Sequence, residues 1–588
     1  MARFFQHVVV VCAAALLAAC SAGAGGKSGG SGPPPGAGGN PPPPPTNHFP
    51  IVRTADTFVF PKAIAGHPLD YDVAQNFSDE DGDPLTFTVT LNGVDATGEW
   101  RGLRVSGSHI VGTPTLPPFS TVEQTGFWMV ASDGRGGSVE TGTVITIQPN
   151  ATPVVTRAGE DRILGLGASV DLETLQATTF EDADGDPLTI TVSLLPLARG
   201  LHVEGTSVRG VIDSNGAVFV HVKADDGFGG TAEDVFALAA PADETRRPTL
   251  PATSFIYDDA QLTMPQIARF ARQFFAPLWD TTEDSQNITS NAGATLGRVL
   301  FYDKRLSITN MGSCGSCHLQ QHGFASPEAF TAGPQGELTK RNVMGLTGVR
   351  YNLDNLYFGD RRAFGLENLV LLPIQEPTEL GNSLELLIPK LAATDFYPPL
   401  FEAAFGTPEI TPERIAQALA QFLRSMIAFN TRFDHAYQPV NEGEEAHPEL
   451  VLTAQELQGA DIFNQHCSRC HSQGAQTMDV SANNGLDLVP ADPGSGEGRF
   501  RAASLRNVAV TAPYMHDGRF ATLRDVIEHY SSGVVDGPLT DPRMRSNVLS
   551  NSVNRNFTED EKAALEAFLD TFTDEEFLTN PKFSDPFQ

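Results

Sequence analysis

The stretch Cys314-Gly315-Ser316-Cys317-His318 decides how the second half of this chain folds, and a second version follows as Cys467-Ser468-Arg469-Cys470-His471. Two cysteines three positions apart can each bond one vinyl group of a haem, and the next histidine can then bind the iron. A zinc site would require four ligands and no histidine directly after the second cysteine. The chain has six cysteines, and the two outside these motifs lie in the first twenty residues. The sequence therefore predicts two covalently attached c-type haems, with His318 and His471 as iron ligands.

The amino terminus has the features of an export signal. An apolar run from Val8 to Ala19 follows Arg3 and is too short for a mature transmembrane helix. It ends in Leu17-Ala-Ala-Cys20, which resembles a bacterial lipoprotein cleavage site with Cys20 as the lipidated residue; the alternative is an ordinary signal peptide cleaved nearby. We therefore expect residues 1–19 to be a lipoprotein signal peptide. The protein is expected in the cell envelope, as an outer-membrane lipoprotein facing the periplasm or the cell surface, in contact with the membrane through its lipid only.

Charge and composition exclude one class of partner and define a linker. The chain has 39 Lys and Arg against 71 Asp and Glu, a formal net charge of -32. A phosphate backbone requires a basic face, so nucleic acid is excluded as a partner.

Residues 20–47 are mostly Gly, Ser and Pro and cannot bury a core. We expect this segment to be a partly stiff tether.

An internal repeat occupies residues 48–149 and 150–243. The stretch from Phe77 to Thr86, with its Asp-x-Asp-Gly-Asp-Pro turn, returns from Phe180 to Thr189, and an alternating apolar stretch follows each turn. Alternation of this kind predicts half-buried strands, and the pattern resembles cadherin-like, immunoglobulin-related β-sandwiches. The acidic turns could bind calcium through their carboxylates, or they could be tight turns in which Asp caps its own backbone. We interpret both modules as spacers or adhesion units, because they contain no catalytic constellation.

From about residue 255 the pattern becomes helical. Leu296, Val299 and Leu300 share one helical face just before the first haem motif. Thr453 and Glu456 form a capping box that opens a helix before the second motif. Further helices are expected to begin at Thr411-Pro412 and, with a capping box, at Thr558 and Glu561.

The expected fold class is thus multidomain. Two all-β immunoglobulin/cadherin-like sandwiches precede an all-α tandem of cytochrome c-type domains. An amino-terminal haem domain, expected to be the peroxide-reacting one, would occupy residues 255–445. A carboxy-terminal haem domain for electron transfer would occupy residues 446–588.

Several stretches of the helical region are similar to one enzyme family. They are Leu296-Gly-Arg-Val-Leu-Phe-Tyr-Asp-Lys-Arg-Leu306, Glu379-Leu-Gly381, Leu505-Arg-Asn507 and Ala512-Pro-Tyr-Met-His-Asp-Gly-Arg-Phe-Ala-Thr-Leu523, the last followed by His529-Tyr530. Together they resemble the bacterial di-haem cytochrome c peroxidase and MauG family, over residues 255–588 and none of the β-repeats. The resemblance implies an oxidoreductase whose haem on His318 meets peroxide. A small c-type cytochrome or cupredoxin would donate electrons, or a protein would be the substrate.

The resemblance also implies roles for single residues. Glu379 falls where the family keeps its distal acid–base carboxylate. Asn342, Thr511 and Pro513 match the positions that supply oxygens to a calcium ion between the haems. Tyr530 stands where the peroxidases place a Met ligand of the second haem and where MauG places a Tyr. Met515 is the alternative ligand, since Met is a normal partner of a c-type haem.

Two positions depart from the family pattern. Gly359 stands where the family usually has a Trp between the haems, and Leu369 stands where a distal Gln is common. Tyr357 or Phe358 could supply the missing ring. His322 lies only four residues past His318, so we expect a surface or packing histidine and an open position on the first haem.

The leading hypothesis is therefore an exported di-haem peroxidase that passes electrons from the carboxy-terminal haem to the amino-terminal haem. The second enzyme hypothesis is a MauG-like oxidase that modifies Trp or Tyr of a partner protein, which Tyr530 favours. Two hypotheses of different classes are a surface electron-transfer cytochrome without peroxide chemistry and an adhesion protein whose β-modules carry the function.

Overall fold

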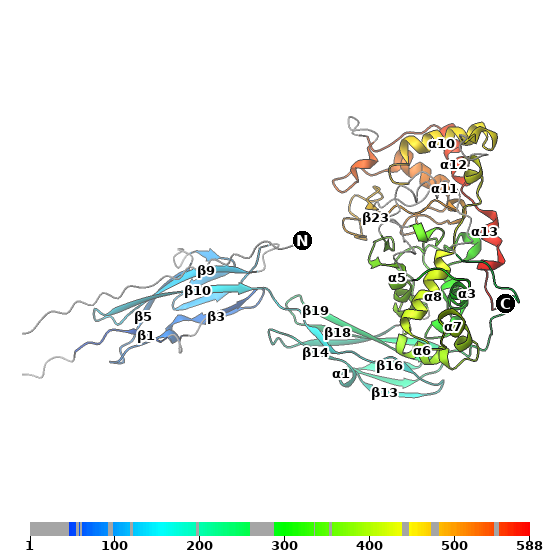
Figure 1. Ribbon diagram of the computed structural model, residues 1–588. Coiled ribbons are helices and arrows are strands. Elements are labelled where there is room, and N and C mark those ends of the chain that lie inside the picture. The colour runs from blue at the N-terminus through cyan, green and yellow to red at the C-terminus, as the bar shows by residue number, and fades with distance from the viewer. Residues whose placement is uncertain are drawn as a thin grey trace, which may run out of the picture. The chain divides into compact units, whose positions relative to one another are not determined.

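The computed structural model describes residues 46–54, 58, 61–91, 98–117, 122–195, 199–258, 287–333, 336–351, 355–437, 446–471, 481–545 and 552–587. The expected signal peptide, the lipidation residue Cys20 and almost all of the tether lie outside these ranges. The chain divides into two compact units, Met1–Pro149 and Asn150–Gln588, both drawn in Figure 1. None of the helices in the described ranges combines the length and apolar character that a bilayer crossing requires.

The first unit contains a β-sandwich, called module 1. One four-stranded sheet has the order β2-β10-β9-β5 and the other has the order β3-β8-β7-β6. Phe127, Met129 and Ala131 of β9 point into the core, and the residues between them point outward. The strands are β1 (Ile51–Val52), β2 (Lys62–Ile64), β3 (Leu69–Asp72), β4 (Phe77–Ser78), β5 (Thr86–Leu91), β6 (Glu99–Trp100), β7 (Leu103–Ser106), β8 (His109–Gly112), β9 (Glu123–Ser132) and β10 (Ser138–Gln148).

The second unit begins with module 2, which repeats this architecture. Its sheets have the orders β12-β19-β18-β15 and β13-β17-β16. In both modules the last strand pairs in parallel with a short early strand, β10 with β2 and β19 with β12. The two predicted β-sandwiches are confirmed. The elements are β11 (Val154–Arg157), β12 (Arg162–Ile163), β13 (Ser169–Glu173), α1 (Thr174–Ala177), β14 (Thr179–Glu181), β15 (Thr189–Leu195), β16 (Leu201–Glu204), β17 (Ser207–Val211), β18 (Gly216–Asp225) and β19 (Thr231–Ala240).

Module 2 buries both faces of its longest strands. The outer face of β18 and β19, which carries Ala217, Phe219, Ala237 and Ala239, packs against Ile308 and Leu386 of the helical region. Backbone contacts reinforce this packing, since Ala242 N donates to Thr309 O at 2.9 Å. On the corresponding face of module 1, Trp128 and Val144 are exposed. Module 2 is therefore a structural part of the helical region.

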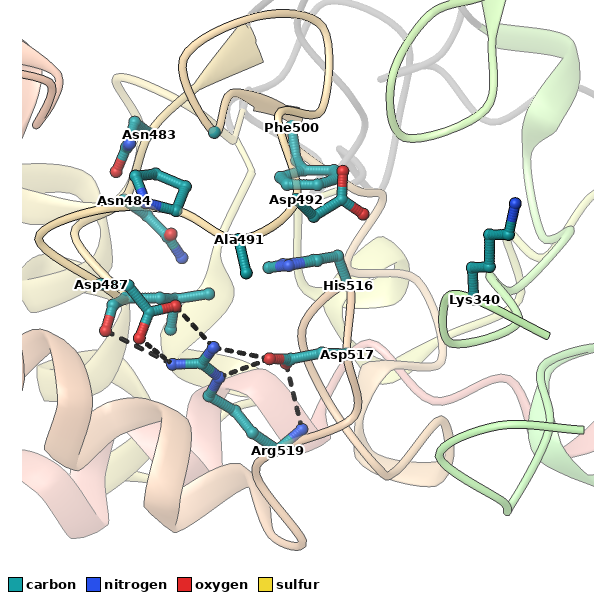
Figure 2. Close-up of a pocket in the computed structure, with 13 residues that line it drawn as sticks. Lys340, Asn483, Asn484, Asp487, Ala491, Asp492, Phe500, His516, Asp517 and Arg519 are labelled. Atoms are coloured by element: carbon teal, nitrogen blue, oxygen red, sulfur yellow. Dashed lines mark hydrogen bonds and ion pairs between the residues drawn. The ribbon is translucent and has the colours of Figure 1, made fainter. Parts of the chain in front are cut away.

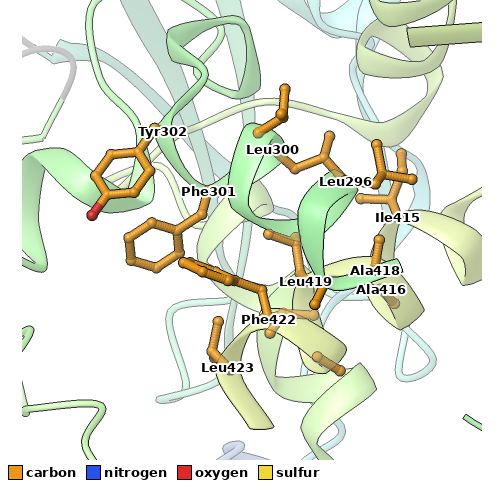
Figure 3. Packing of buried hydrophobic residues seen from close by; sticks show 14 of the residues in the cluster. Leu296, Leu300, Phe301, Tyr302, Ile415, Ala416, Ala418, Leu419, Phe422 and Leu423 are labelled. Atoms are coloured by element: carbon orange, nitrogen blue, oxygen red, sulfur yellow. The ribbon is translucent and has the colours of Figure 1, made fainter. Parts of the chain in front are cut away.

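The helical region contains two units built alike. In the first haem unit, helices α3 (Asn291–Tyr302) and α8 (Pro412–Arg424) cross at Gly297, where a β-carbon would collide with the carbonyl oxygen of Ala418. Around the crossing, Phe301 and Phe422 stack edge to face at 5.4 Å, within the apolar cluster that Figure 3 shows.

The second haem unit repeats the crossing with α10 (Ala454–His466) and α12 (Glu559–Asp570). Here the close approach is at Gly459 against the carbonyl oxygen of Ala564, and Phe463 and Phe568 lie 5.5 Å apart. The predicted capping boxes at Thr453 and Thr558 are both present. The all-α tandem is confirmed.

The remaining helices complete the two haem units. They are α4 (Cys314–Cys317), α5 (Leu366–Gln375), α6 (Leu384–Ala392), α7 (Tyr397–Phe405), α9 (Arg432–Tyr437), α11 (Leu523–Glu528) and α13 (Glu575–Thr579). Short strand pairs join β20 (Leu356–Tyr357) to β21 (Ala363–Phe364) and β22 (Ser481–Ala482) to β23 (Phe500–Arg501).

The chain exchanges segments between the two haem units. Phe433 of α9 packs in the core of the second unit, although it precedes residue 446. Phe577, Phe583 and Phe587 near the carboxy terminus pack in the core of the first unit, where Phe583 O accepts a hydrogen bond from Tyr302 Oη at 2.7 Å. The packing thus differs from a simple division of the sequence at residue 446, because residues distant in sequence complete each core.

Deleting the β-modules should show that only module 2 contributes to the stability of the helical region. We expect deletion of residues 46–149 to leave the unfolding free energy of the helical region unchanged. Deletion of residues 46–243 should lower it by about 2 kcal/mol or more, the scale for uncovering one or two large apolar side chains such as Ile308 and Leu386. Guanidinium unfolding followed by haem absorbance measures both, and equal stability of the two shortened proteins would contradict the shared core.

Candidate haem-binding sites

The first haem motif lies in a partly buried turn with a capping box at its start. Cys314 and Cys317 bound the single turn α4, and both are free thiols. Burial raises the pKa of Cys314 to about 12, so this sulfur is shielded from water. His318 Nδ1 lies 2.7 Å from the carbonyl oxygen of Phe324, which fixes the imidazole and leaves Nε2 as a ligand nitrogen. Gly323 and Phe324 both have left-handed backbone conformations, with φ of 61°, and this turn brings the Phe324 carbonyl group to His318.

The second motif has the same chemistry. Cys467 ends α10, and Cys467 and Cys470 are free thiols. Nδ1 of His471 lies 3.0 Å from the carbonyl oxygen of Ala503, and burial lowers the pKa of His471 to about 4, so the ring stays neutral. Paired buried thiols and an oriented neutral imidazole at each motif fit a covalently attached haem.

Glu379 lies beside the first motif. A backbone hydrogen bond from Glu379 N to Glu376 O, at 2.9 Å, closes the turn that contains it. A second hydrogen bond, from Ile308 N to Leu380 O at 3.0 Å, links this turn to the segment before the motif. Burial, together with the negative charge of Glu376, raises the pKa of Glu379 to about 7 against the opposing positive charge of Arg362. The Glu379 charge is also close enough to raise the pKa of Cys314 and Cys317, after burial. A carboxyl group that titrates near neutral pH can accept and return a proton.

Tyr530 and Met515 approach the second motif together. Tyr530 follows α11 in a π-helical turn, His529–Gly533, and burial raises the pKa of its phenol to about 12. The nearby Cys470 and Cys467 also raise the pKa of this phenol, which places it beside the second motif. Asn484 Nδ2 lies 3.4 Å from Tyr530 Oη and 3.5 Å from Met515 Sδ. Both candidate ligands thus flank one amide group, and the choice between them stays a prediction.

The residues predicted to bind calcium between the haems are engaged with backbone groups. Asn342 Nδ2 donates to Glu328 O at 3.2 Å and Ala329 O at 3.3 Å, and Thr511 Oγ1 donates to Val508 O at 3.1 Å. Pro513 lies next to Gly518, which also contacts Ala329. The calcium site stays a prediction.

The acidic turns of the β-modules have the hydrogen bonds of self-capping turns and also bring carboxylates close together. Asp79 Oδ1 accepts hydrogen bonds from Asp81 N at 2.9 Å and Asp83 N at 3.2 Å, as expected of a self-capping turn. Across the described ranges, two clusters have carboxylates close enough to share a cation, and both are these turns: Asp79, Asp81 and Asp83, and Asp182, Asp184 and Asp186. The geometry is compatible with either interpretation.

His322 and Leu369 have structural surroundings. His322 Nδ1 lies 3.3 Å from Val510 O, in agreement with the predicted packing role. Leu369, at the position of the family's distal Gln, is 9% exposed in the core of the first haem unit.

Several residues that organise the sites were not singled out from the sequence. Arg506 forms a bidentate ion pair with Asp434, at 2.6 and 2.8 Å, in full burial. Arg341 binds Asp492 through two nitrogens and Asp360 through a third, which joins the two haem units. The Leu505-Arg-Asn507 motif contains Arg506, but no sequence signal indicates its partner.

A cavity of about 150 Å³ lies on the second haem unit, lined by Asn484, Phe500 and His516 among others. Figure 2 shows Arg519 below it, held by Asp487 and Asp517. Asp492 faces the same cavity, and its ion pair with Arg341 lowers its pKa to about 2.

Comparisons with known proteins identify the family of the helical region. Residues 291–442 match the family model described as di-haem cytochrome c peroxidase. The methylamine utilization protein MauG of Methylophilus methylotrophus is 31% identical over 270 residues, which cover 44% of this chain and 78% of that protein. This chain belongs to the di-haem cytochrome c peroxidase and MauG family. It is accordingly an oxidoreductase whose family carries two c-type haems.

Both branches of the family are among the relatives. Cytochrome c551 peroxidase of Nitrosomonas europaea is 29% identical over 48% of this chain and 79% of that protein. A crystal structure of a MauG-like protein associated with microbial copper homeostasis is 32% identical, covers 52% of this chain and 95% of that chain, and has a TM-score of 0.44. The similarity establishes the di-haem family as a whole and is shared by its peroxidases and its MauG proteins.

The two motifs predict a haem count that can be measured. The mature protein should give two haems per chain in a pyridine haemochrome assay, because each motif supplies two thiols and one ligand histidine. Replacing Cys467 and Cys470 with Ser should leave one haem per chain. A wild-type value of one would contradict the second site.

Proposed function

We propose that this protein is an exported di-haem peroxidase that reduces hydrogen peroxide at the site of Cys314, Cys317 and His318. The observation that carries the proposal is the placement of Glu379, a half-buried carboxyl group beside the first haem motif with a pKa raised to about 7. A solvated surface glutamate would have neither the burial nor the raised pKa.

The residues of this site would divide the work as follows. A haem held by Cys314, Cys317 and His318 would supply the iron that binds and reduces peroxide. Glu379 Oε would accept a proton from one peroxide oxygen and return it to the other, which becomes the leaving water. Two electrons and two further protons convert each peroxide into two water molecules. Phe324 O would keep the His318 ring oriented by accepting a hydrogen bond from its Nδ1–H group.

Electrons would enter through the second haem unit. The donor would be a small c-type cytochrome or a cupredoxin, and the net charge of -32 favours a donor with a basic face. We also propose lipidation at Cys20, an outer-membrane location facing the periplasm or surface, and a calcium ion at Asn342, Thr511 and Pro513. Module 1 would act as a spacer or adhesion unit.

A second candidate function is MauG-like oxidation of Trp or Tyr in a partner protein. The observation that favours it is the half-buried phenol of Tyr530, whose pKa is raised by desolvation and by the nearby Cys470 and Cys467. A phenolate ligand donates more charge to iron than a thioether and stabilises its higher oxidation states. A non-catalytic electron-transfer cytochrome would show no peroxide turnover at all.

Glu379→Gln should slow peroxide turnover by about 100-fold, the scale for loss of an acid–base group, with both haem spectra nearly unchanged. In the wild type, turnover should fall as the pH drops below about 7, because only the ionised carboxylate accepts the peroxide proton. Steady-state peroxide assays across pH 5 to 9 measure both effects.

The matched control is Glu376→Gln, which makes the same change in the same turn. It should keep turnover and move the acid limb to lower pH, because it removes a negative charge that raises the pKa of Glu379. Full activity of Glu379→Gln would remove this carboxyl group from the mechanism.

The ligand of the second haem distinguishes the two enzyme hypotheses. If Tyr530 is the ligand, electron paramagnetic resonance should show a histidine/phenolate haem that disappears in Tyr530→Phe, and the reduction potential should lie below that of a His/Met haem. Tyr530→Met should give a His/Met spectrum and favour turnover with a reduced cytochrome. A Met–iron charge-transfer band in the near-infrared spectrum of the wild type would instead identify Met515 and support the ordinary peroxidase.

A further inference from the structure

The space beside Gly359 is filled by a side chain from the other haem unit. A β-carbon at Gly359 would lie 3.4 Å from Cδ1 of Phe500 and 3.7 Å from Sδ of Met344. A backbone hydrogen bond fixes the approach, since Arg501 N donates to Gly359 O at 2.8 Å. A side chain at 359 would therefore begin in van der Waals contact with Phe500 and Met344.

Phe500 stacks on His516. The ring centroids are 4.0 Å apart and the ring planes differ by 13°. Both residues are labelled in Figure 2. The guanidinium carbon of Arg341 lies 5.3 Å from the Phe500 centroid, while its nitrogens bind Asp360 of the first haem unit and Asp492 of the second. The stacked pair is thus held at the seam, defined here as Arg341, Gly359, Asp492, Phe500 and His516.

The seam connects the surroundings of the two iron ligands. On one side, the backbone of Met344 lies near the His318 imidazole, and the Met344 side chain borders Gly359 next to Phe500. On the other side, His516 directly follows Met515, whose Sδ lies 3.5 Å from Asn484 Nδ2. Asn484 in turn contacts Tyr530 Oη at 3.4 Å. Packed atoms therefore lead from His318 through the stacked rings to Tyr530.

The rings that the sequence suggested for this role lie elsewhere. Tyr357 is 2% exposed within the core of the first haem unit. Phe358 packs against that core and lies under Arg362, 3.6 Å from the guanidinium carbon to the ring centroid. Both rings belong to the first unit, whereas Phe500 and His516 belong to the second unit and meet the first at Gly359 and Arg341.

We propose that the stacked Phe500–His516 pair carries the electronic coupling between the two haem-binding sites, at the place that Gly359 leaves open. The proposal rests on the two-haem enzyme proposed above. One electron leaves the haem held by His471 and enters the haem held by His318. No bond forms or breaks, no proton moves, and neither ring is oxidised or reduced. Two π systems in contact provide overlap that an aliphatic side chain at position 500 would not.

Carbon monoxide flash photolysis of the full-length two-haem protein tests the pair without peroxide. Carbon monoxide is bound to the half-reduced protein, a flash removes it, and absorbance follows the electron as it redistributes between the haems. Phe500→Leu should slow this redistribution by about tenfold or more, and His516→Gln should do the same. Phe500→Tyr, which keeps the ring, should stay close to the wild-type rate.

The control variant is Phe364→Leu, which makes the same change at a ring that is 65% exposed and outside the seam. Its rate should equal that of the wild type. Visible spectra and reduction potentials of both haems should be unchanged in all four variants, which separates loss of coupling from loss of a haem environment. A wild-type rate in Phe500→Leu and His516→Gln, or an equal loss in Phe364→Leu, would overturn the proposal.

A size exchange across the seam provides an independent test. Phe500→Ala should slow redistribution, and Gly359→Trp added to Phe500→Ala should restore most of the lost rate, because the new ring takes the vacated space. A double variant as slow as Phe500→Ala would overturn the claim that a ring at this place carries the coupling. Since redistribution is measured without peroxide, a protein that transfers the electron but does not turn over peroxide would contradict the proposed function alone.

Discussion

The close approach of two helices at a glycine is the constraint on which both haem sites depend. Gly297 lets α3 contact the backbone of α8, and Gly459 lets α10 contact the backbone of α12. In each case the residue four positions later is a phenylalanine, Phe301 or Phe463, that packs on a phenylalanine of the facing helix. A side chain at either glycine would separate the helices and displace these rings. Cys467 ends α10 itself, so the position of the second motif follows directly from this crossing.

The two haem units are joined by polar contacts as well as by exchanged segments. Arg341 binds carboxylates from both units, and Arg506 pairs with Asp434 in full burial. Buried ion pairs of this kind add little net stability, but loss of one partner leaves an uncompensated charge. Their contribution here is therefore geometric. The Arg341 contacts fix the relative position of the two units at the seam, where a small displacement would separate Phe500 from Gly359. The Arg506–Asp434 pair holds α9 within the second unit.

Local features of the sequence predicted the architecture and much of the site. Capping boxes, apolar periodicity and the two haem motifs involve neighbouring residues, and the helices begin where these signals occur. The β-repeat was equally visible, because each turn carries its own aspartates and glycine. Contacts between distant segments were not predictable in this way. The outer face of β18 looks like an ordinary strand until Ile308 covers it, and nothing near Gly359 indicates Phe500, which lies far away in sequence.

Burial acts on two acids of the haem units with opposite consequences. Glu379 is desolvated to a pKa of about 7, so both of its protonation states are accessible near neutral pH and it is suited to proton transfer. The Tyr530 phenol is desolvated to a pKa of about 12, so it stays neutral at that pH unless a cation binds its oxygen. One desolvated acid therefore titrates near neutral pH beside the first motif, and the other stays protonated beside the second. Desolvation acts in the same direction on both acids, and their different intrinsic pKa values decide that only Glu379 titrates near neutral pH.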